Sequence, residues 1–257
     1  MEILNDTNLV IDSTLIDEKI QRGYNFNLGD YLSQGWEIFK KEWLTFSIYS
    51  LLMLVIIFIA SITIIGLLFV IYPLLLGYFI GAEKVNRGEN LSIGDMFGGF
   101  KKLPKLALLT LIPVAIMALV SLPFSGAFIG FANMADANGS MDDVFGGAAM
   151  GSLMLMYLLM FIVGMVLSLA LFFAPYLIFF GNYSVIDALK TSWQISLKQP
   201  LFIILFAILI GFIAQIGTLL CGIGVFASMG FAYVCYYPAI KDILFTPTHS
   251  IDNSSSI

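Results

Sequence analysis

Long uncharged stretches alternate along this chain with short segments that carry acids, lysines and tryptophans. Four stretches contain no charged residue, at 43–82, 106–135, 144–186 and 199–240. A membrane-spanning helix needs about 20 mainly apolar residues. The first and last stretches can therefore hold two spans each, and the second holds one span and an apolar loop. The third stretch holds either one long tilted span or two.

The positions of the basic residues favour one of these alternatives. With one span in 144–186, all twelve Lys and Arg residues fall on one face of the membrane; with two, the last three change sides. Lys and Arg near span ends stay in the cytoplasm, so the pattern predicts six spans with both termini cytoplasmic. The chain is thus expected to be an all-α, polytopic membrane helical bundle of the cytoplasmic (inner) membrane. Its spans are predicted at about 44–63, 64–82, 106–122, 153–180, 199–219 and 223–244.

A short motif of a polar cap, two spacers and an aspartate occurs three times, each time before a span. The cap can accept a hydrogen bond from the first turn of a helix, and the aspartate is favoured by the positive helix end. Each motif opens an amphipathic, lysine-bearing stretch. The sequence therefore predicts three repeats of an interfacial helix followed by a membrane hairpin, at 27–91, 92–183 and 184–245. The predicted cap residues are Asn27, Asp30, Ser92, Asp95, Ser184 and Asp187.

Two polar segments flank the repeats. Residues 1–26 carry more acids than bases and are interpreted as a mobile cytoplasmic arm, with a short helix from Thr14 that stops at Gly23. The arm lacks the apolar core of a signal peptide. Residues 246–257 form a polar cytoplasmic tail.

Composition agrees with a membrane protein. Hydrophobic residues make up 60% of the chain and charged residues 11%, against roughly 25% charged residues in soluble domains. The net charge of −5 argues against a nucleic-acid partner, which would need a basic surface. The net charge does not alter the predicted orientation, because orientation follows the Lys and Arg residues near span ends, and Asp and Glu contribute little to it.

Tryptophans beside lysines mark the expected membrane surface. Tryptophan rings settle at the level of the lipid headgroups, and nearby lysines attract anionic lipids. Membrane lipids with anionic headgroups are therefore the expected partners, together with an unidentified membrane or cytoplasmic protein. The expected lipid-interface anchors are Trp36, Lys40, Lys41, Trp43, Lys101, Lys102, Trp193 and Lys198.

The predicted spans carry no charge near their middle. A charge at mid-bilayer marks a functional site, so its absence argues against an ion-coupled pump. A proline falls in the second span of each repeat, where it can kink the helix or shape a cavity. Gly77 and Gly81 are spaced to let another helix approach closely. The residues expected at a cavity or kink are Pro73, Pro175, Gln215 and Pro238.

Residues typical of an enzyme or a metal site are scarce. The one histidine, His249, lies in the polar tail, and no catalytic triad, zinc spacing or phosphate-binding glycine loop is present. Counted from Asp136, the acidic external segment departs from a calcium loop at position six, which is Met141, and at position twelve, which is Gly147. Cys221 and Cys235 are expected to be buried thiols. We expect no catalytic residue, metal or cofactor.

Three stretches resemble a group of bacterial six-span membrane proteins. They are the tryptophan–lysine helix before the first span, Asp-Met-Phe-Gly-Gly-Phe at 95–100, and Asp-Ala-Leu-Lys-Thr-Ser-Trp at 187–193. The group includes uncharacterised YciC-type proteins and the membrane domain attached to some glycerophosphodiester phosphodiesterases. The resemblance covers about residues 27–245 and implies a cytoplasmic-membrane protein without an established activity. It does not imply the phosphodiesterase, whose soluble catalytic domain has no counterpart here.

Two main functional hypotheses follow. The first is a non-enzymatic support or membrane-organising module, whose basic and aromatic helices form a cytoplasmic collar on anionic headgroups. The alternative is a permease or lipid-translocation protein for a neutral or lipid substrate. That alternative requires a polar cavity near Gln215 or the proline kinks. A third hypothesis, an intramembrane lipid enzyme, lacks a visible acid–base pair.

Overall fold

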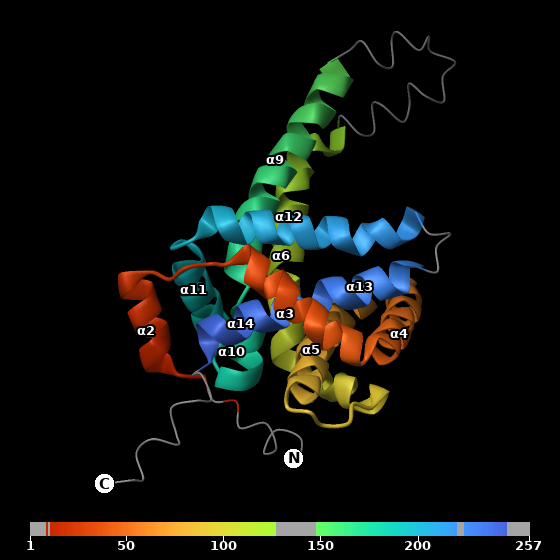
Figure 1. The fold of residues 1–257 in the computed structure, drawn as a ribbon. Helices are drawn as coiled ribbons and strands as arrows, with labels where there is room; N and C mark the ends of the chain where they lie inside the picture. Colours follow the sequence, from red (N-terminus) through yellow and green to blue (C-terminus); the bar gives the residue numbers. More distant parts are fainter. Residues whose placement is uncertain (1–8, 10, 127–147, 220–223, 246–257) are drawn as a thin grey trace. The chain divides into compact units, whose positions relative to one another are not determined.

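The computed structural model describes residues 9, 11–126, 148–219 and 224–245. Within these ranges the chain is helical throughout its regular structure, apart from one isolated antiparallel bridge between Ile11 and Phe245 (Figure 1). The predicted all-α, polytopic bundle is thereby confirmed. The chain divides into two compact units, one of Met1–Thr110 with Leu169–Ile257 and one of Leu111–Ser168.

Five helices in the described ranges are long and apolar enough to cross a membrane, which makes the chain an integral membrane protein. Their exposed side chains are largely apolar, as expected for helices whose outer surface contacts lipid rather than water. The five helices span Trp43–Ser61, Ile65–Asn86, Ile93–Phe124, Met150–Gly181 and Pro200–Leu219.

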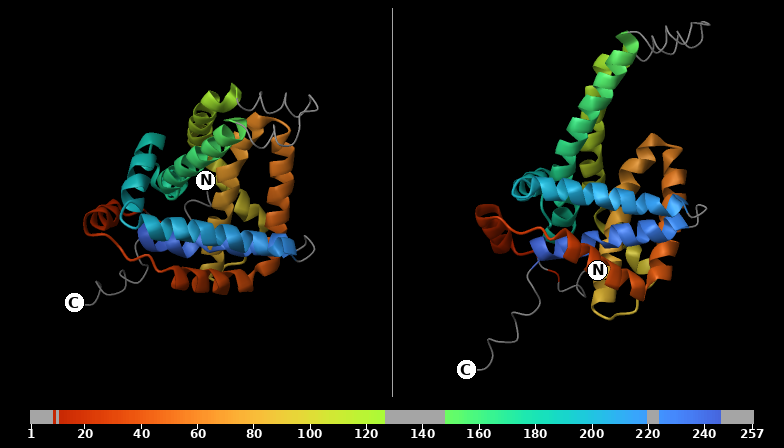
Figure 2. Two further views of the ribbon diagram at one scale, coloured as in Figure 1. Left: turned by 90° about the horizontal axis from the view of Figure 1, so that it is seen from above. Right: turned by 45° about the horizontal axis from the view of Figure 1, so that its top comes forward.

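The larger unit contains a hairpin of α4 (Trp43–Ser61) and α5 (Ile64–Asn86). The turn between them falls where the sequence predicts it, so the two helices are antiparallel neighbours (Figure 2). Buried hydroxyls join them. Tyr49 donates to the carbonyl of Leu74 over 2.9 Å, and the hydroxyls of Ser50 and Tyr78 lie 2.9 Å apart.

The second predicted interfacial helix differs from the expectation in its conformation and its position. Residues Ile93–Lys102 form a 3-10 helix, η1, which packs alongside α5 instead of lying beyond its end. A Cβ added at Gly99 would lie 2.1 Å from the Pro73 carbonyl oxygen, and one at Gly77 2.2 Å from that of Met96. Glycine is therefore required on both sides of this contact. The close approach predicted at Gly77 is confirmed, but its partner is η1.

The long predicted span at 153–180 is broken into α9 (Ala148–Leu171) and α10 (Ala174–Gly181). Pro175 cannot donate to the carbonyl of Leu171 and its ring clashes there, so α9 ends at that residue. Ser192 of α11 (Val185–Ser196) bonds to two backbone groups at this break. Its hydroxyl accepts from the Phe173 N–H over 3.0 Å and donates to the Leu169 carbonyl over 3.3 Å.

A proline also breaks the last predicted span. After α12 (Pro200–Ile216) and the 3-10 turn η3 (Gly217–Leu219), the predicted span at 223–244 forms α13 (Gly224–Val234) and α14 (Tyr236–Leu244). Pro238 lies four residues after Val234, where α13 ends. Helix α3 (Leu28–Lys41) packs across this break, because Gly35 lets the backbone of Cys235 approach.

The segment 11–26, interpreted from the sequence as part of a mobile arm, belongs to the larger unit and packs against α11 and α14. Its helix α2 (Ser13–Arg22) begins earlier than predicted because Asp12 caps it, accepting from Thr14 N over 2.9 Å, and it ends at Gly23 as predicted. Ile16 and Phe26 are buried. The phenyl ring of Phe26 lies edge-on to Tyr31, with ring centroids 4.9 Å apart.

The smaller unit consists of the greater part of α6 (Leu103–Ser121), the short 3-10 turn η2 (Leu122–Phe124) and α9 up to residue 168. The two long helices pack through a glycine: a Cβ added at Gly164 of α9 would lie 3.3 Å from Met117 Cε of α6. Their outer surfaces are apolar, with Leu119 and Phe161 among the exposed residues.

Candidate functional site

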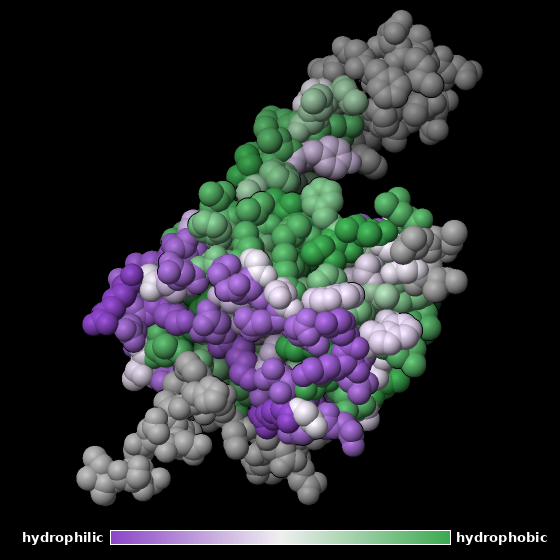
Figure 3. Space-filling view, in the orientation of Figure 1, coloured by the Kyte–Doolittle hydropathy of each residue, from purple (hydrophilic) through white to green (hydrophobic). Residues whose placement is uncertain are grey.

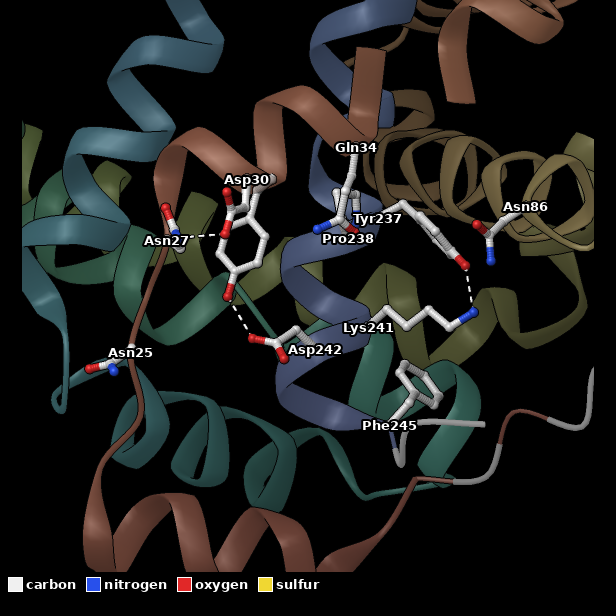
Figure 4. Close-up of a pocket in the computed structure, with 11 residues that line it drawn as sticks. Asn25, Asn27, Asp30, Gln34, Asn86, Tyr237, Pro238, Lys241, Asp242 and Phe245 are labelled. Atoms are coloured by element: carbon white, nitrogen blue, oxygen red, sulfur yellow. Dashed lines mark hydrogen bonds between the residues drawn. The ribbon is translucent and has the colours of Figure 1, made fainter. Parts of the chain in front are cut away.

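A polar pocket of about 410 Å³ opens in the larger unit beside α3, α14 and the C-terminal end of α5 (Figure 4). Buried residues of its lining come from α3 and the α14 region: Tyr31, Tyr237, Pro238 and Phe245. Exposed residues of its lining are nearly all amides and carboxylates: Asn25, Asn27, Asp30, Gln34, Asn86 and Asp242. Aromatic residues thus form the base of the pocket, and hydrogen-bonding groups surround its opening.

A charge network lies beside the pocket. Glu83 of α5 is 2% exposed and accepts from Lys241 Nζ over 2.8 Å and from the Tyr237 hydroxyl over 2.5 Å. Arg87 binds the other oxygen of the same carboxylate, with 2.7 Å between Nε and Oε1. Charge-assisted hydrogen bonds of this kind are the strong ones, so the network joins the end of α5 to α14.

The two carboxylates of the lining have different partners. Asp30 accepts from the amide of Asn27 over 2.5 Å, and Asp242 accepts from the Tyr31 hydroxyl over 2.6 Å. Neither carboxylate forms an ion pair with a residue in the described ranges. Burial raises the pKa of Tyr31 above its ordinary value of 10.0, and the bond to Asp242 raises it further. Tyr31 is therefore a neutral hydrogen-bond donor.

The N-terminal segment holds one side of the pocket in place. Gln199 donates to the Tyr24 carbonyl over 2.9 Å, and the Tyr24 hydroxyl donates to the Ile195 carbonyl over 3.1 Å. Lys19 donates to the main-chain carbonyl of Asp242 over 2.5 Å. Burial lowers the pKa of the Lys19 ammonium below its ordinary value of 10.5. The segment from α2 to Asn27 is thus fixed to both α11 and α14.

The expected lipid anchors occupy different environments. Around the junction of α3 and α4, Trp36 is 46% exposed and Trp43 is 55% exposed, and the two lysines between them are also exposed. Figure 3 shows that hydrophilic residues gather over α2 and α3. Lys102 is partly buried and donates to the Asn182 side chain over 3.2 Å. The remaining anchors are an exposed Lys101, a half-buried Trp193 and an exposed Lys198.

Two of the three predicted caps make the side-chain hydrogen bond of a helix cap. Ser92 and Asp95 form a capping box, and Asp95 also pairs with Lys84 over 2.9 Å. Ser184 accepts from the Asp187 N–H over 3.2 Å. Asn27 occupies the N-cap position of α3, but its side chain makes no hydrogen bond to the first turn. Its amide donates to the charged carboxylate of Asp30 instead, because a charged acceptor forms the stronger bond.

The residues expected at a cavity or kink do not come together. Pro238 lines the pocket, and Pro175 opens α10 after a helix break. Pro73 is buried inside α5, where its carbonyl meets η1. Gln215 is exposed on α12 and does not line this pocket.

Several sequence features cannot be placed. The acidic segment 136–143, Cys221 and His249 lie outside the described residues. Cys235 is a buried free thiol, as expected. In the described ranges, no three His, Cys, Asp or Glu side chains are grouped so that they could hold a metal ion.

The link between Glu83 and Lys241 could not be identified from the sequence, because nothing in it shows which lysine pairs with this acid. The only local signal is Arg87, one helical turn after Glu83. The arrangement can bind a polar ligand through amides, carboxylates and aromatic rings. Comparison of the chain with known protein families, curated proteins and solved structures finds no match.

Proposed function

We propose that the chain is a non-enzymatic, multi-pass protein of the cytoplasmic membrane that supports a partner protein or organises the membrane around it. Both termini lie in the cytoplasm in this proposal. The observation that carries it is the junction of α3 and α4, where the exposed rings of Trp36 and Trp43 flank the exposed Lys40 and Lys41. We call these four residues the α3–α4 collar.

The α3–α4 collar has the chemistry of a lipid-headgroup contact. Helix α4 is apolar all round and follows α3, which presents polar residues on one face and buries Ile38 and Phe39 on the other. Amphipathic rings settle at the boundary between such segments, and lysines there attract anionic headgroups. Trp36 also stacks on Phe39, with centroids 5.9 Å apart, which holds its ring in place without burying it.

The other four predicted lipid anchors give the proposal less support. Trp193 and Lys198 belong to the connection from α11 to α12 and suit a second contact with headgroups. Lys101 and Lys102 end η1, which runs beside α5 as far as Pro73. The proposal therefore rests on the α3–α4 collar, with Trp193 and Lys198 as additional anchors.

The experiment is native mass spectrometry of the purified protein from nanodiscs that contain phosphatidylglycerol and phosphatidylcholine. A lysine near an anionic surface contributes about 1 kcal/mol. Replacing Lys40 and Lys41 together by glutamine should therefore lower retention of phosphatidylglycerol roughly 30-fold. The matched control is Arg22→Gln, which removes an exposed charge from α2 outside the collar. Equal retention in all three proteins would contradict the proposal.

The alternative function, a permease or lipid-translocation protein, is favoured by one observation. The pocket contains Pro238, one of the residues where the sequence predicts a cavity. If this alternative is correct, the protein in liposomes should move a labelled neutral solute or lipid faster than empty liposomes do. No increase over empty liposomes would favour the support module.

A further inference from the structure

We propose that the polar pocket beside α3 and α14 is a binding site for an organic ammonium group. The inference goes beyond the proposed function and does not depend on it, because none of the four collar residues lines the pocket. It rests on two properties of the pocket: its lining has more carboxylates than ammonium groups, and its buried residues are mainly aromatic.

The charges around the pocket favour a cation. Its lining contains two carboxylates, Asp30 and Asp242, and one ammonium, that of Lys241. The Lys241 ammonium is bonded to Glu83 over 2.8 Å, a carboxylate that it shares with Arg87. Lys19 bonds the main-chain carbonyl of Asp242 and attracts its carboxylate, but does not line the pocket. An anionic ligand would therefore meet two carboxylates without a free cation among the lining residues to offset them.

The base of the pocket suits the alkyl part of such a cation. Tyr31, Tyr237 and Phe245 are buried aromatic residues contributed by α3 and by α14 and its end. Aromatic faces attract ammonium groups within about 6 Å of the ring centroid. Pockets that bind small molecules combine an apolar base with a few well-placed polar groups, as this one does.

Lys241 and Asp242 belong to different parts of the lining. The Lys241 ammonium donates to Glu83 over 2.8 Å and to the Tyr237 hydroxyl over 2.6 Å. The Asp242 carboxylate accepts from the Tyr31 hydroxyl over 2.6 Å, and Figure 4 shows this carboxylate apart from the Lys241 ammonium. A ligand ammonium would bind at Asp242, next to Tyr31.

The surrounding amides would bind the rest of the ligand. Asn25, Gln34 and Asn86 are exposed around the opening, and each can donate and accept hydrogen bonds. A primary or quaternary amine with a polar substituent fits this arrangement. Such a group is found both in the headgroup of an aminolipid and in a free amine, so the test must separate these sources.

The test uses the full chain in two arms. In the first, tetramethylammonium chloride and ethanolamine hydrochloride are titrated into detergent-purified protein by isothermal calorimetry, with sodium chloride as the ionic-strength control. In the second, native mass spectrometry counts phosphatidylethanolamine retained from nanodiscs that contain it beside phosphatidylglycerol. Binding in the first arm identifies a free amine, and retention in the second arm identifies a lipid headgroup.

Matched variants test whether the ammonium binds in the pocket. Asp242→Asn and Asp30→Asn keep the shape of each side chain and remove its charge, and each should weaken binding at least tenfold. Gln34→Lys adds a cation at the opening and should weaken binding to a similar extent. Glu37→Gln removes an exposed acid from the same helix outside the pocket and should change binding less than twofold. Size-exclusion profiles confirm that each variant is folded.

Two results would overturn the proposal. One is the absence of ammonium binding by the unmodified chain in both arms. The other is binding that stays within twofold in Asp242→Asn, Asp30→Asn and Gln34→Lys alike, which would place the amine elsewhere on the protein. Binding in either arm that is lost in these variants and kept in Glu37→Gln would support it.

Discussion

Glu83 and Lys241 form an ion pair, with 2.8 Å between Oε2 and Nζ, although 158 positions separate them in the chain. The Glu83 side chain is 3% exposed and that of Lys241 21%. The Tyr237 hydroxyl donates to the same carboxylate oxygen. The pair therefore fixes the end of α5 against α14, next to the pocket that we assign to an ammonium ligand.

Glu83→Gln should strongly destabilise the larger unit. The substitution leaves the Lys241 ammonium without its anionic partner in a partly buried position, and breaking a buried pair from one side costs about 3 kcal/mol or more. The measurement is the thermal midpoint of the detergent-purified protein, determined from the loss of its monodisperse size-exclusion peak on heating. The double variant Glu83→Gln, Lys241→Met should recover part of the loss, because it removes the unmatched charge.

Glu89→Gln is the matched control for this substitution. Glu89 is 44% exposed and lies 3.8 Å from Arg87, so its removal should cost less than about 1 kcal/mol. Equal midpoints for the Glu83 and Glu89 variants would show that the network around Glu83 does not stabilise the fold.

Gly99→Ala should separate η1 from α5. The added Cβ would meet the carbonyl of Pro73 at 2.1 Å, and a backbone atom cannot move aside as a flexible side chain can. Overpacking of this kind costs typically 1–3 kcal/mol. The control is Gly211→Ala on α12, where a Cβ meets nothing within 4 Å and alanine favours the helix. Thermal midpoints should fall for the first variant and stay or rise for the second; a fall in both would contradict the close contact.

Alkaline pH should weaken the fold through Tyr31. Burial, helped by the bond to Asp242, raises the pKa of Tyr31 in the folded protein above the 10.0 of an exposed tyrosine. The neutral phenol thus contributes stability that is present in full below pH 10 and is lost as the pH rises through the folded pKa. The thermal midpoint of Tyr31→Phe should be lower than that of the unmodified chain at pH 8 and should fall less steeply above pH 10. Parallel curves would contradict this contribution.

Hydropathy and the distribution of lysines were sufficient to predict the helical bundle and the first hairpin. The turn between α4 and α5 follows from one uncharged stretch that is too long for a single span. The helix breaks at Pro175 and Pro238 were predicted only as kinks. The helix can break fully at Pro175 because Ser192 of α11 forms hydrogen bonds with the Phe173 N–H and the Leu169 carbonyl. Such a distant partner cannot be identified from one sequence.

The candidate site was predicted less well, because its residues come together only in three dimensions. The pocket combines α3, α14 and the segment at Asn25, which the sequence analysis assigned to a mobile arm. Ile16 and Phe26 of that arm are buried and anchor it. The 3-10 conformation of η1 was also missed. Its apolar positions fit a helix of either kind, so the sequence does not distinguish them.

The most direct test of the proposed role is extraction of the protein from its own membrane into native-lipid nanodiscs, with mass spectrometry of every co-purifying lipid and protein. The proposal predicts anionic lipid enriched over the bulk membrane, together with a partner protein in constant stoichiometry. The Lys40→Gln, Lys41→Gln variant should lose the lipid enrichment. Lipids in bulk proportion and no constant partner, with the protein intact and monodisperse, would contradict the role of a support or membrane-organising module.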